Sequence, residues 1–321
     1  MEFKTRTTQG EEKEKSARTR QVPQALVTMP PYAPYIEKVL KHKSVSGIRL
    51  NTVMPIKGAL EDTLSGLNNL AKIHEKELWI DLKCRQLRIK TFGVPPFTEV
   101  ELSHNLEVYT PCKAYFSDRN ESATVLAVEG NKLIMQEGPR RVVGPGESVT
   151  IPHSTLRIQG YLTDSDKRYI ETCALLGIHN YMLSFVEQEA DIEELKRYDT
   201  QAQSIAKIES QRGLDYISHA PTPPRLMAAR GDLYMELNWP HTILEATERI
   251  IRKDKDAIAA SRILSSLASR PEPTCEDLGD LDNLLRMGYR TVMFGDEMCL
   301  REESILTGLN VFAAVAERYS R

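Results

Sequence analysis

Short apolar runs alternate with longer amphipathic stretches from about Gln24 to the end of the chain. This alternation is typical of βα units that wind around a parallel sheet. It predicts strands at residues 25–29, 47–53, 78–83, 180–186, 204–209, 225–233, 257–263 and 290–294. Helical patterns between them include residues 61–76, 165–176, 191–198, 241–253, 275–287 and 305–319. Eight strands that are each followed by a helix predict an α/β fold, a closed (β/α)8 TIM barrel.

The connection after the third predicted strand breaks this rhythm. Residues 89–159 contain no convincing helix but show alternating segments at residues 99–109, 123–128, 132–136 and 148–151. A structureless loop of this length is improbable, so the pattern predicts a small β-barrel domain inserted after strand 3. Because it leaves the carboxyl end of a strand, this insert is expected to overhang the active-site face as a lid. The barrel then comprises residues 24–88 and 160–321, and the polar residues 1–23 are expected to form a disordered tail.

Composition narrows the class of protein. The 321 residues are 41% hydrophobic, which is enough for a large core, and 42 Lys and Arg nearly balance 45 Asp and Glu. This balance gives no overall electrostatic case for a nucleic-acid or membrane partner. The five cysteines are scattered without a Cys-x-x-Cys pair, which argues against disulfides or zinc and favours a cytoplasmic setting. No apolar run reaches the roughly 18 residues that span a bilayer.

Charged residues at two predicted strand ends carry the strongest chemical signal. Lys207 and Glu209 are two positions apart, so on a strand both side chains project from one face. Asp232 comes at the end of the next predicted strand. The carboxyl ends of parallel strands meet at one face of a barrel, so the three groups predict a site for a divalent metal and an anion. A surface ion pair is the alternative.

Other predicted strand ends repeat this pattern. Arg49 and Asn51 end the second strand, Asp81 and Lys83 end the third, and Ser261 belongs to the seventh, with Arg88 shortly after the third. Inward positions of a barrel are normally filled by apolar side chains, so several charged groups at one end are costly unless a ligand or metal compensates them.

Four runs, in this order and spacing, resemble pyruvate kinase. They are Leu183-Ser-Phe-Val186, Ile205-Ala-Lys-Ile-Glu209, Leu226-Met-Ala-Ala-Arg-Gly-Asp-Leu233 and Ser269-Arg-Pro-Glu-Pro-Thr274. The resemblance covers roughly residues 24–317 and includes the position of the insert. The separate C-terminal domain of that family is expected to be absent, because the chain ends with the eighth predicted barrel helix, and allosteric control through it is not expected. Self-association through outer helices stays open.

The resemblance implies a role for each candidate residue. Glu209 and Asp232 would hold Mg²⁺, or Mn²⁺ in its place, and hard oxygen ligands suit this ion. The implied catalytic residues are Lys207, Arg49 and Arg88, which would neutralise and clamp a phosphoryl group. The implied substrate-binding groups are the backbone at Ala229, Gly231 and Asp232 and the hydroxyl of Ser261, which replaces a threonine.

Departures from the family pattern are concentrated in two places. Two of four expected potassium ligands are missing, because Thr52-Val-Met-Pro55 replaces a Ser-His-Gly turn and Leu82 replaces a threonine. Asn51 and Asp81 would be the residual monovalent-cation site, and the case for K⁺ is weak. On the nucleotide side, Glu147 replaces a basic residue, and Gly295-Asp-Glu-Met298 replaces Ser-Gly-Glu-Thr. The metal and enolate half is therefore better preserved than the nucleotide half.

Three hypotheses for function follow. The first is a pyruvate kinase-like, Mg²⁺-dependent phosphotransferase that acts on phosphoenolpyruvate or pyruvate through an enolate, with degenerate nucleotide and potassium sites. The second is a Mg²⁺-dependent lyase or aldolase that forms a pyruvate enolate without a nucleotide. The third is a non-catalytic homologue that binds a 2-oxo acid or enol phosphate.

Overall fold

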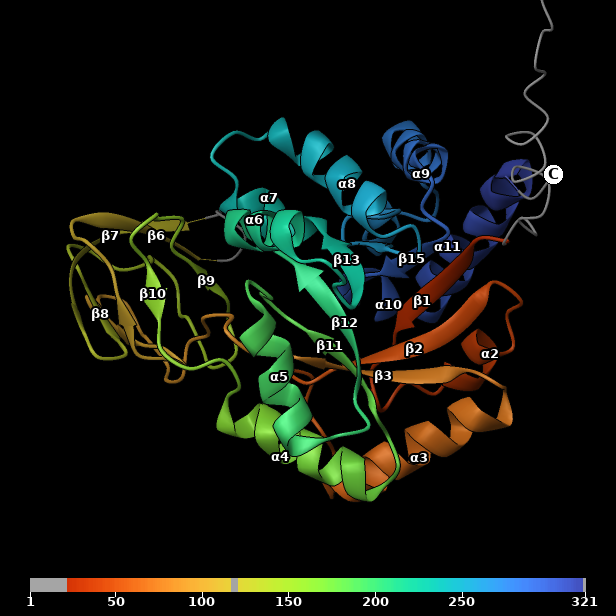
Figure 1. Ribbon diagram of the computed structural model, residues 1–321, viewed down its shortest axis with the longest axis horizontal. Coiled ribbons are helices and arrows are strands. Elements are labelled where there is room, and N and C mark those ends of the chain that lie inside the picture. The colour runs from red at the N-terminus through yellow and green to blue at the C-terminus, as the bar shows by residue number, and fades with distance from the viewer. Residues whose placement is uncertain (1–21, 117–120, 320–321) are drawn as a thin grey trace, which may run out of the picture.

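The computed structural model describes residues 22–116 and 121–319. Eight parallel strands close into a barrel in the order β1-β15-β14-β13-β12-β11-β3-β2. The strands are β1 (Gln24–Thr28), β2 (Val45–Asn51), β3 (Glu77–Leu82), β11 (Asn180–Leu183), β12 (Gln203–Ile208), β13 (Arg225–Ala229), β14 (Ile258–Ala260) and β15 (Thr291–Phe294). The predicted α/β barrel is therefore confirmed, with helices packed around the sheet (Figure 1).

Alternate residues of each barrel strand enter two different cores, because successive side chains point to opposite faces of the sheet. The barrel interior is filled by Leu26, Trp79, Met182, Ile205, Met227, Ala229, Ile258, Ala260 and Met293. Their neighbours, such as Val27, Ile80 and Ala206, pack with the helix layer instead. The interior is thus a packed core at this level, and only positions further toward the carboxyl ends can line an open cavity.

The outer layer contains ten α-helices in the described residues, and six of them begin within three residues of a predicted helical range. The ten are α2 (Ile36–Leu40), α3 (Leu60–Ile73), α4 (Asp164–Leu175), α5 (Glu189–Tyr198), α6 (Gln211–His219), α7 (Arg230–Glu236), α8 (Thr242–Lys253), α9 (Cys275–Met287), α10 (Asp296–Cys299) and α11 (Glu302–Ala316). Capping boxes at Thr163 and Thr274 start α4 and α9, since each threonine hydroxyl accepts from the backbone N–H three residues later. The short helices α7 and α10 were not predicted.

The segment between β3 and α4 forms a second, β-rich unit beside the barrel (Figure 1). Five strands pair in the order β4-β8-β7-β6-β9, and two more pair as β10-β5. Their bounds are β4 (Glu99–Glu101), β5 (Leu106–Glu107), β6 (Cys112–Phe116), β7 (Glu121–Glu129), β8 (Lys132–Met135), β9 (Val149–Thr150) and β10 (Arg157–Ile158). These strands pair as two sheets, not as one closed ring. A separate apolar core, which includes Phe116 and Leu133, stabilises this insert.

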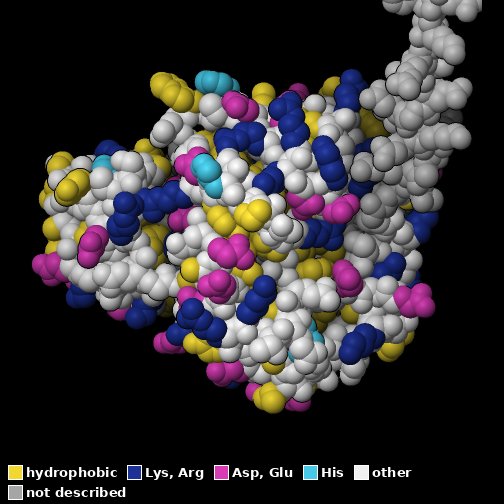
Figure 2. Space-filling model, viewed as in Figure 1, with side chains coloured by type: hydrophobic (Ala, Val, Ile, Leu, Met, Phe, Trp, Pro, Cys, Tyr) yellow, Lys and Arg dark blue, Asp and Glu magenta, His cyan; other side chains and the backbone are white. Residues whose placement is uncertain are grey.

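The surface agrees with the balanced composition. Figure 2 shows Lys and Arg side chains interspersed with Asp and Glu over the face that it presents. Within the described ranges, no helix is both long and apolar enough to cross a membrane. The predicted tail falls almost entirely on residues outside the described part of the chain.

Candidate active site

A cavity of about 280 Å³ opens at the carboxyl ends of the barrel strands. Nine of the ten predicted site residues line it: Arg49, Asn51, Arg88, Lys207, Glu209, Ala229, Gly231, Asp232 and Ser261. The tenth, Asp81, is completely buried and contacts three of the lining side chains, Arg49, Lys83 and Lys207. Chain segments more than 200 residues apart in sequence therefore meet at one cavity.

Lys207 and Glu209 lie in the cavity because they continue the inward-facing positions of β12 beyond the packed Ile205. The ammonium of Lys207 is 3.1 Å from Asp81 Oδ1, 3.1 Å from Glu209 Oε1 and 2.8 Å from Ser184 Oγ. Only 5% of Lys207 and 1% of Glu209 is exposed. This burial excludes the alternative of a surface ion pair.

One oxygen of Glu209 retains capacity for a ligand. Its Oε2 accepts a hydrogen bond from the backbone N–H of Phe185 at 2.8 Å. The other oxygen, Oε1, is buried and lies near the Lys207 ammonium. The geometry of this contact does not make a hydrogen bond, so Oε1 has no hydrogen-bond partner among the described residues. Burial raises the pKa of Glu209 to about 7, and the negative charges of Asp232 and Asp81 add to this effect against the opposing charge of Lys207.

Asp232 lies in the cavity as predicted, but it belongs to a helix and not to a strand. The expected strand at residues 225–233 is wrong in its second half, because β13 ends at Ala229 and Asp232 lies in the first turn of α7. Its Oδ1 accepts a hydrogen bond from Gln86 Nε2 at 3.2 Å. A Cβ at Gly231 would lie 3.3 Å from Ser261, so glycine allows this turn to approach the end of β14 closely.

Asp81 is the centre of a buried cluster of cations. Its carboxylate accepts from Arg49, whose Nε is 2.8 Å away, from Lys83 at 3.2 Å and from Lys207 at 3.1 Å. Burial alone would raise the pKa of Asp81, but the charges of Arg49, Lys207 and Lys83 hold it well below its usual value. Burial lowers the pKa of Lys83 to about 8, with the neighbouring cations adding to the effect and Asp81 opposing it.

The two residues of the expected monovalent-cation site are engaged by protein groups. Asp81 is surrounded by the three side-chain cations of its cluster. The amide of Asn51 donates to Asp296 Oδ2 at 2.8 Å, and Arg49 donates to Asp296 Oδ1 at 2.7 Å. Asp296 thus links the two residues that end β2. The sequence analysis noted Asp296 only as part of a run that departs from the family pattern. The acidic residue in that run was the one sign that could have pointed to its role.

Arg88 lies where the chain leaves the barrel for the insert. Its guanidinium donates to the carbonyl oxygen of Gly146 and to Gln86 Oε1. Its Nε is buried without a hydrogen-bond partner in the described part of the molecule. Gln86, which also contacts Asp232, is a second residue that the sequence did not single out. Arg88 therefore presents unused donor capacity to an anion in the cavity.

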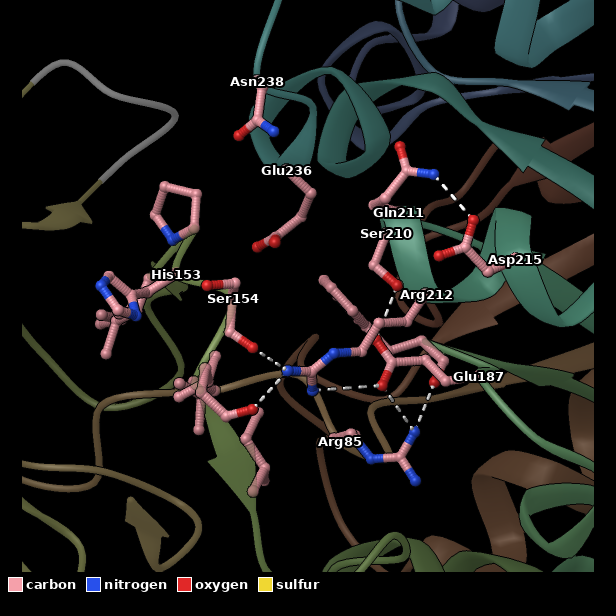
Figure 3. Close-up of a pocket in the computed structure, with 17 residues that line it drawn as sticks. Arg85, His153, Ser154, Glu187, Ser210, Gln211, Arg212, Asp215, Glu236 and Asn238 are labelled. Atoms are coloured by element: carbon pink, nitrogen blue, oxygen red, sulfur yellow. Dashed lines mark hydrogen bonds and ion pairs between the residues drawn. The ribbon is translucent and has the colours of Figure 1, made fainter. Parts of the chain in front are cut away.

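A second cavity, of about 290 Å³, lies between the insert and the barrel (Figure 3). Its charged groups satisfy one another. Arg212 donates to the carbonyl oxygens of Ser154 and Leu156 at 3.0 and 2.6 Å, and Glu187 lies between Arg212 and Arg85. The two cavities have similar volumes, so chemistry and not size selects the first as the candidate active site.

A barrel whose strand ends place carboxylates, a lysine and arginines around one cavity defines a ligand-binding or catalytic (β/α)8 protein. Residues 102–300 match the family model for pyruvate kinase, barrel domain. The chain belongs to the pyruvate kinase family.

Curated relatives agree. The pyruvate kinase of Borreliella burgdorferi is 26% identical over 290 residues, which cover 81% of this chain and 60% of that protein. The pyruvate kinase of Methanocaldococcus jannaschii is 24% identical over 294 residues, which cover 86% of this chain and 65% of that protein. The pyruvate kinase of Thermoplasma acidophilum is 29% identical over 161 residues, or 47% of this chain and 29% of that protein. The chain spans a little over three-fifths of the length of the first two relatives.

Proposed function

We propose that the chain is a Mg²⁺-dependent enzyme that acts on phosphoenolpyruvate or pyruvate through an enolate and transfers the phosphoryl group to or from a nucleotide. One observation carries this proposal. Lys207, Glu209 and Asp232 line a single cavity, and the first two are buried with a contact of 3.1 Å. Membership of the pyruvate kinase family supports the reaction class.

The donor set fits Mg²⁺. Among the described residues no three His, Cys, Asp or Glu converge on one point, so a site built wholly from protein ligands is not formed. Mg²⁺ commonly takes one or two carboxylates and completes its octahedron with water and substrate. Glu209, with its orphaned Oε1, and Asp232 would hold the ion. When bound, the ion would supply positive charge that favours the enolate.

The protein's own groups act on the substrate from several sides. Lys207 is held between Asp81 and Glu209, so its ammonium is fixed where it can neutralise charge on an enolate oxygen or a phosphoryl group. Arg49 is fixed by Asp81 and Asp296, whereas Arg88 keeps a free Nε for phosphate oxygens. Ala229, Gly231 and Ser261 line the wall where the substrate carboxylate would bind.

Potassium is not required in this proposal. The carboxylate of Asp81 already has Arg49, Lys83 and Lys207 around it, and the amide of Asn51 is bound to Asp296. Side-chain cations thus supply the positive charge that a monovalent ion would otherwise bring. Turnover should be the same in sodium and potassium salts of equal ionic strength.

A Mg²⁺-dependent lyase that forms the same enolate is the second candidate. It is favoured by Glu147, which stands on the nucleotide side of the family pattern. Its carboxylate pairs with Arg141 at 3.0 Å, so this position itself supplies no positive charge to attract phosphates. The same Lys207, Glu209 and Asp232 would serve this reaction.

Thermal unfolding with ligands separates the candidates. A ligand at 100 times its dissociation constant stabilises a protein by about 2.7 kcal/mol. Oxalate, which resembles the enolate, should stabilise the protein only together with Mg²⁺. Stabilisation by Mg²⁺-ADP, with turnover of phosphoenolpyruvate and ADP that Lys207→Met abolishes, supports the kinase. Oxalate stabilisation without any nucleotide effect supports the lyase, and the absence of both refutes the site.

A further inference from the structure

One arginine of the candidate active site is not explained by the proposed function. Arg262 follows Ser261 at the end of β14 and lines the same cavity as Lys207 and Asp232. Its side chain is exposed. No carboxylate in the described ranges forms an ion pair with it, whereas Arg49 and Lys207 are each paired.

The surroundings of Arg262 orient the guanidinium without neutralising it. The guanidinium carbon lies 4.7 Å from the centre of the Tyr234 ring, which belongs to α7. A cation over an aromatic face is attracted to it but keeps its N–H donors available around its edge. Tyr234 therefore restricts the guanidinium and leaves its charge for a ligand.

The backbone that presents Arg262 is unusual. Ser261 and Arg262 both have positive φ, at 68° and 58°, and Leu264 has φ of 51°. Residues other than glycine adopt this left-handed region rarely, and such residues cluster at functional sites. The fold thus maintains a left-handed turn, and its second residue lines the cavity with a guanidinium that forms no ion pair in the described residues.

Arg262 and Arg88 both line the cavity but follow strands on opposite sides of the barrel. In the closed ring of strands, β3, which precedes Arg88, and β14, which precedes Arg262, are four strands apart in either direction. Neither guanidinium forms an ion pair with a carboxylate in the described part of the chain. The cavity is therefore lined by two guanidinium groups that come from different parts of the barrel and form no ion pair with a carboxylate in the described residues.

From this arrangement we infer that Arg262 binds a second acidic group on the substrate. The inference rests on the proposed function and names its substrate class. That class comprises 2-oxo acids, or their enol phosphates, with an additional carboxylate at the end remote from the 2-oxo group. Because Arg262 is adjacent to Ser261 and faces the turn that carries Asp232, it serves the substrate end of the cavity and not the nucleotide end.

Calorimetric titration in Mg²⁺ with matched acids tests the inference. The probes are oxaloacetate against 2-oxobutyrate, and 2-oxoglutarate against 2-oxopentanoate, since each pair differs in the second carboxylate. A charge-assisted contact predicts that one diacid binds about 10- to 100-fold tighter than its monoacid. Arg262→Gln should reduce this ratio to about one, and Arg262→Lys should give an intermediate value. Arg252→Gln, an exposed arginine on α8, is the matched control and should keep the full ratio.

Each other outcome has a defined meaning. A ratio near one for both pairs in the unmodified protein, or a ratio that Arg262→Gln leaves unchanged, overturns the inference. Loss of ADP binding in Arg262→Gln with an intact diacid preference assigns Arg262 to the nucleotide and also overturns it. Oxalate titration in Mg²⁺ on the same proteins tests the proposed function separately. If oxalate fails to bind but the diacid ratio depends on Arg262, the proposed function fails and the second-acid contact stands.

Discussion

Replacement of Asp81 by asparagine tests whether the buried cation cluster is organised by one carboxylate. Asp81 has no exposed surface and accepts from Arg49, Lys83 and Lys207. Asparagine keeps the shape but removes the charge, so three cations that are nearly buried lose their common partner. Removal of one member of a buried ion pair destabilises a protein by about 3–5 kcal/mol. We therefore expect the free energy of unfolding to fall by about 3–5 kcal/mol.

Asp296→Asn is the matched control, because Asp296 binds the same arginine. Its contact with Arg49 is 2.7 Å, but 41% of its side chain is exposed. Exposed ion pairs contribute about 0–1 kcal/mol, so this variant should lose less than about 1 kcal/mol. The two variants thus differ in burial while they share a partner and a substitution.

Urea titration followed by circular dichroism measures both losses, provided that the slope with denaturant stays unchanged. The double variant Asp81→Asn with Lys83→Met should recover part of the loss, because it removes one uncompensated cation from the cluster. A loss below about 1.5 kcal/mol for Asp81→Asn, or equal losses for the two asparagine variants, would refute the reasoning. Such a result would mean that water or neighbouring groups already compensate the cations.

Four further predictions concern metal binding, the stability of the metal-free protein, the lysine and the insert. The pKa of Glu209 is raised from 4.5 to about 7, so its proton must leave before a cation binds. The Mg²⁺ affinity, measured by calorimetry, should therefore rise with pH up to about 7 and then level off. In the metal-free protein, the free energy of unfolding should fall between pH 4.5 and about 7, because the buried Glu209 becomes charged. Glu209→Gln should remove this fall. If the variant and the unmodified protein show the same dependence of stability on pH, the raised pKa is contradicted. Lys207→Met should lower turnover of phosphoenolpyruvate by at least about a hundredfold while Lys207→Arg retains part of it, and equal activity of the two variants would exclude an electrostatic role. Arg212→Ala should speed exchange of the Leu156 amide, which donates to the carbonyl of His153, relative to Arg212→Lys, because the guanidinium that holds the carbonyls of Ser154 and Leu156 is lost; identical exchange would show that this contact does not hold the insert.

The residues that line the cavity from the barrel strands were predictable, because side chains alternate between the two faces of a strand with a period of two residues. Position 205 faces the barrel interior, so positions 207 and 209 face the same way, and the sequence alone gives the residues there. The same reasoning brought Arg49, Asn51 and Asp81 to one end of the barrel. Spacing along single strands therefore predicted which side chains meet, without any knowledge of distances between strands.

The start of α7 could not be predicted from the same kind of pattern. Leu233 and Met235 are both buried and two positions apart, which is the spacing of a strand, although they belong to a helix of only seven residues. Two buried positions in so short a segment do not distinguish a period of two from a period of 3.6. Asp232 nevertheless reached the expected cavity, because the carboxyl end of β13 fixes where the helix begins.

The sequence also could not predict which side chains form hydrogen bonds or ion pairs with one another. The run at residues 295–298 signalled a departure from the family, but not that Asp296 joins Arg49 to Asn51. Lys83 lies two positions after Asp81, so spacing placed these two side chains together, but the approach of Arg49 and Lys207 from two other strands needed coordinates. Contacts between side chains that are remote in sequence depend on the register of the whole barrel, which local patterns do not specify.

The charges of the cavity argue that metal and anion bind together. The positive groups are Arg49, Lys83, Arg88, Lys207 and Arg262, and the negative groups are Asp81, Glu209, Asp232, Asp296 and Glu297. Their formal charges cancel when all are ionised, so a divalent ion alone would leave an excess of positive charge in a partly buried space. A dianion such as oxalate removes that excess, and the ion in turn offsets the carboxylates that would repel the anion. Affinity for oxalate should therefore rise with Mg²⁺, and affinity for Mg²⁺ should rise with oxalate by the same factor, because coupling of two binding equilibria is reciprocal.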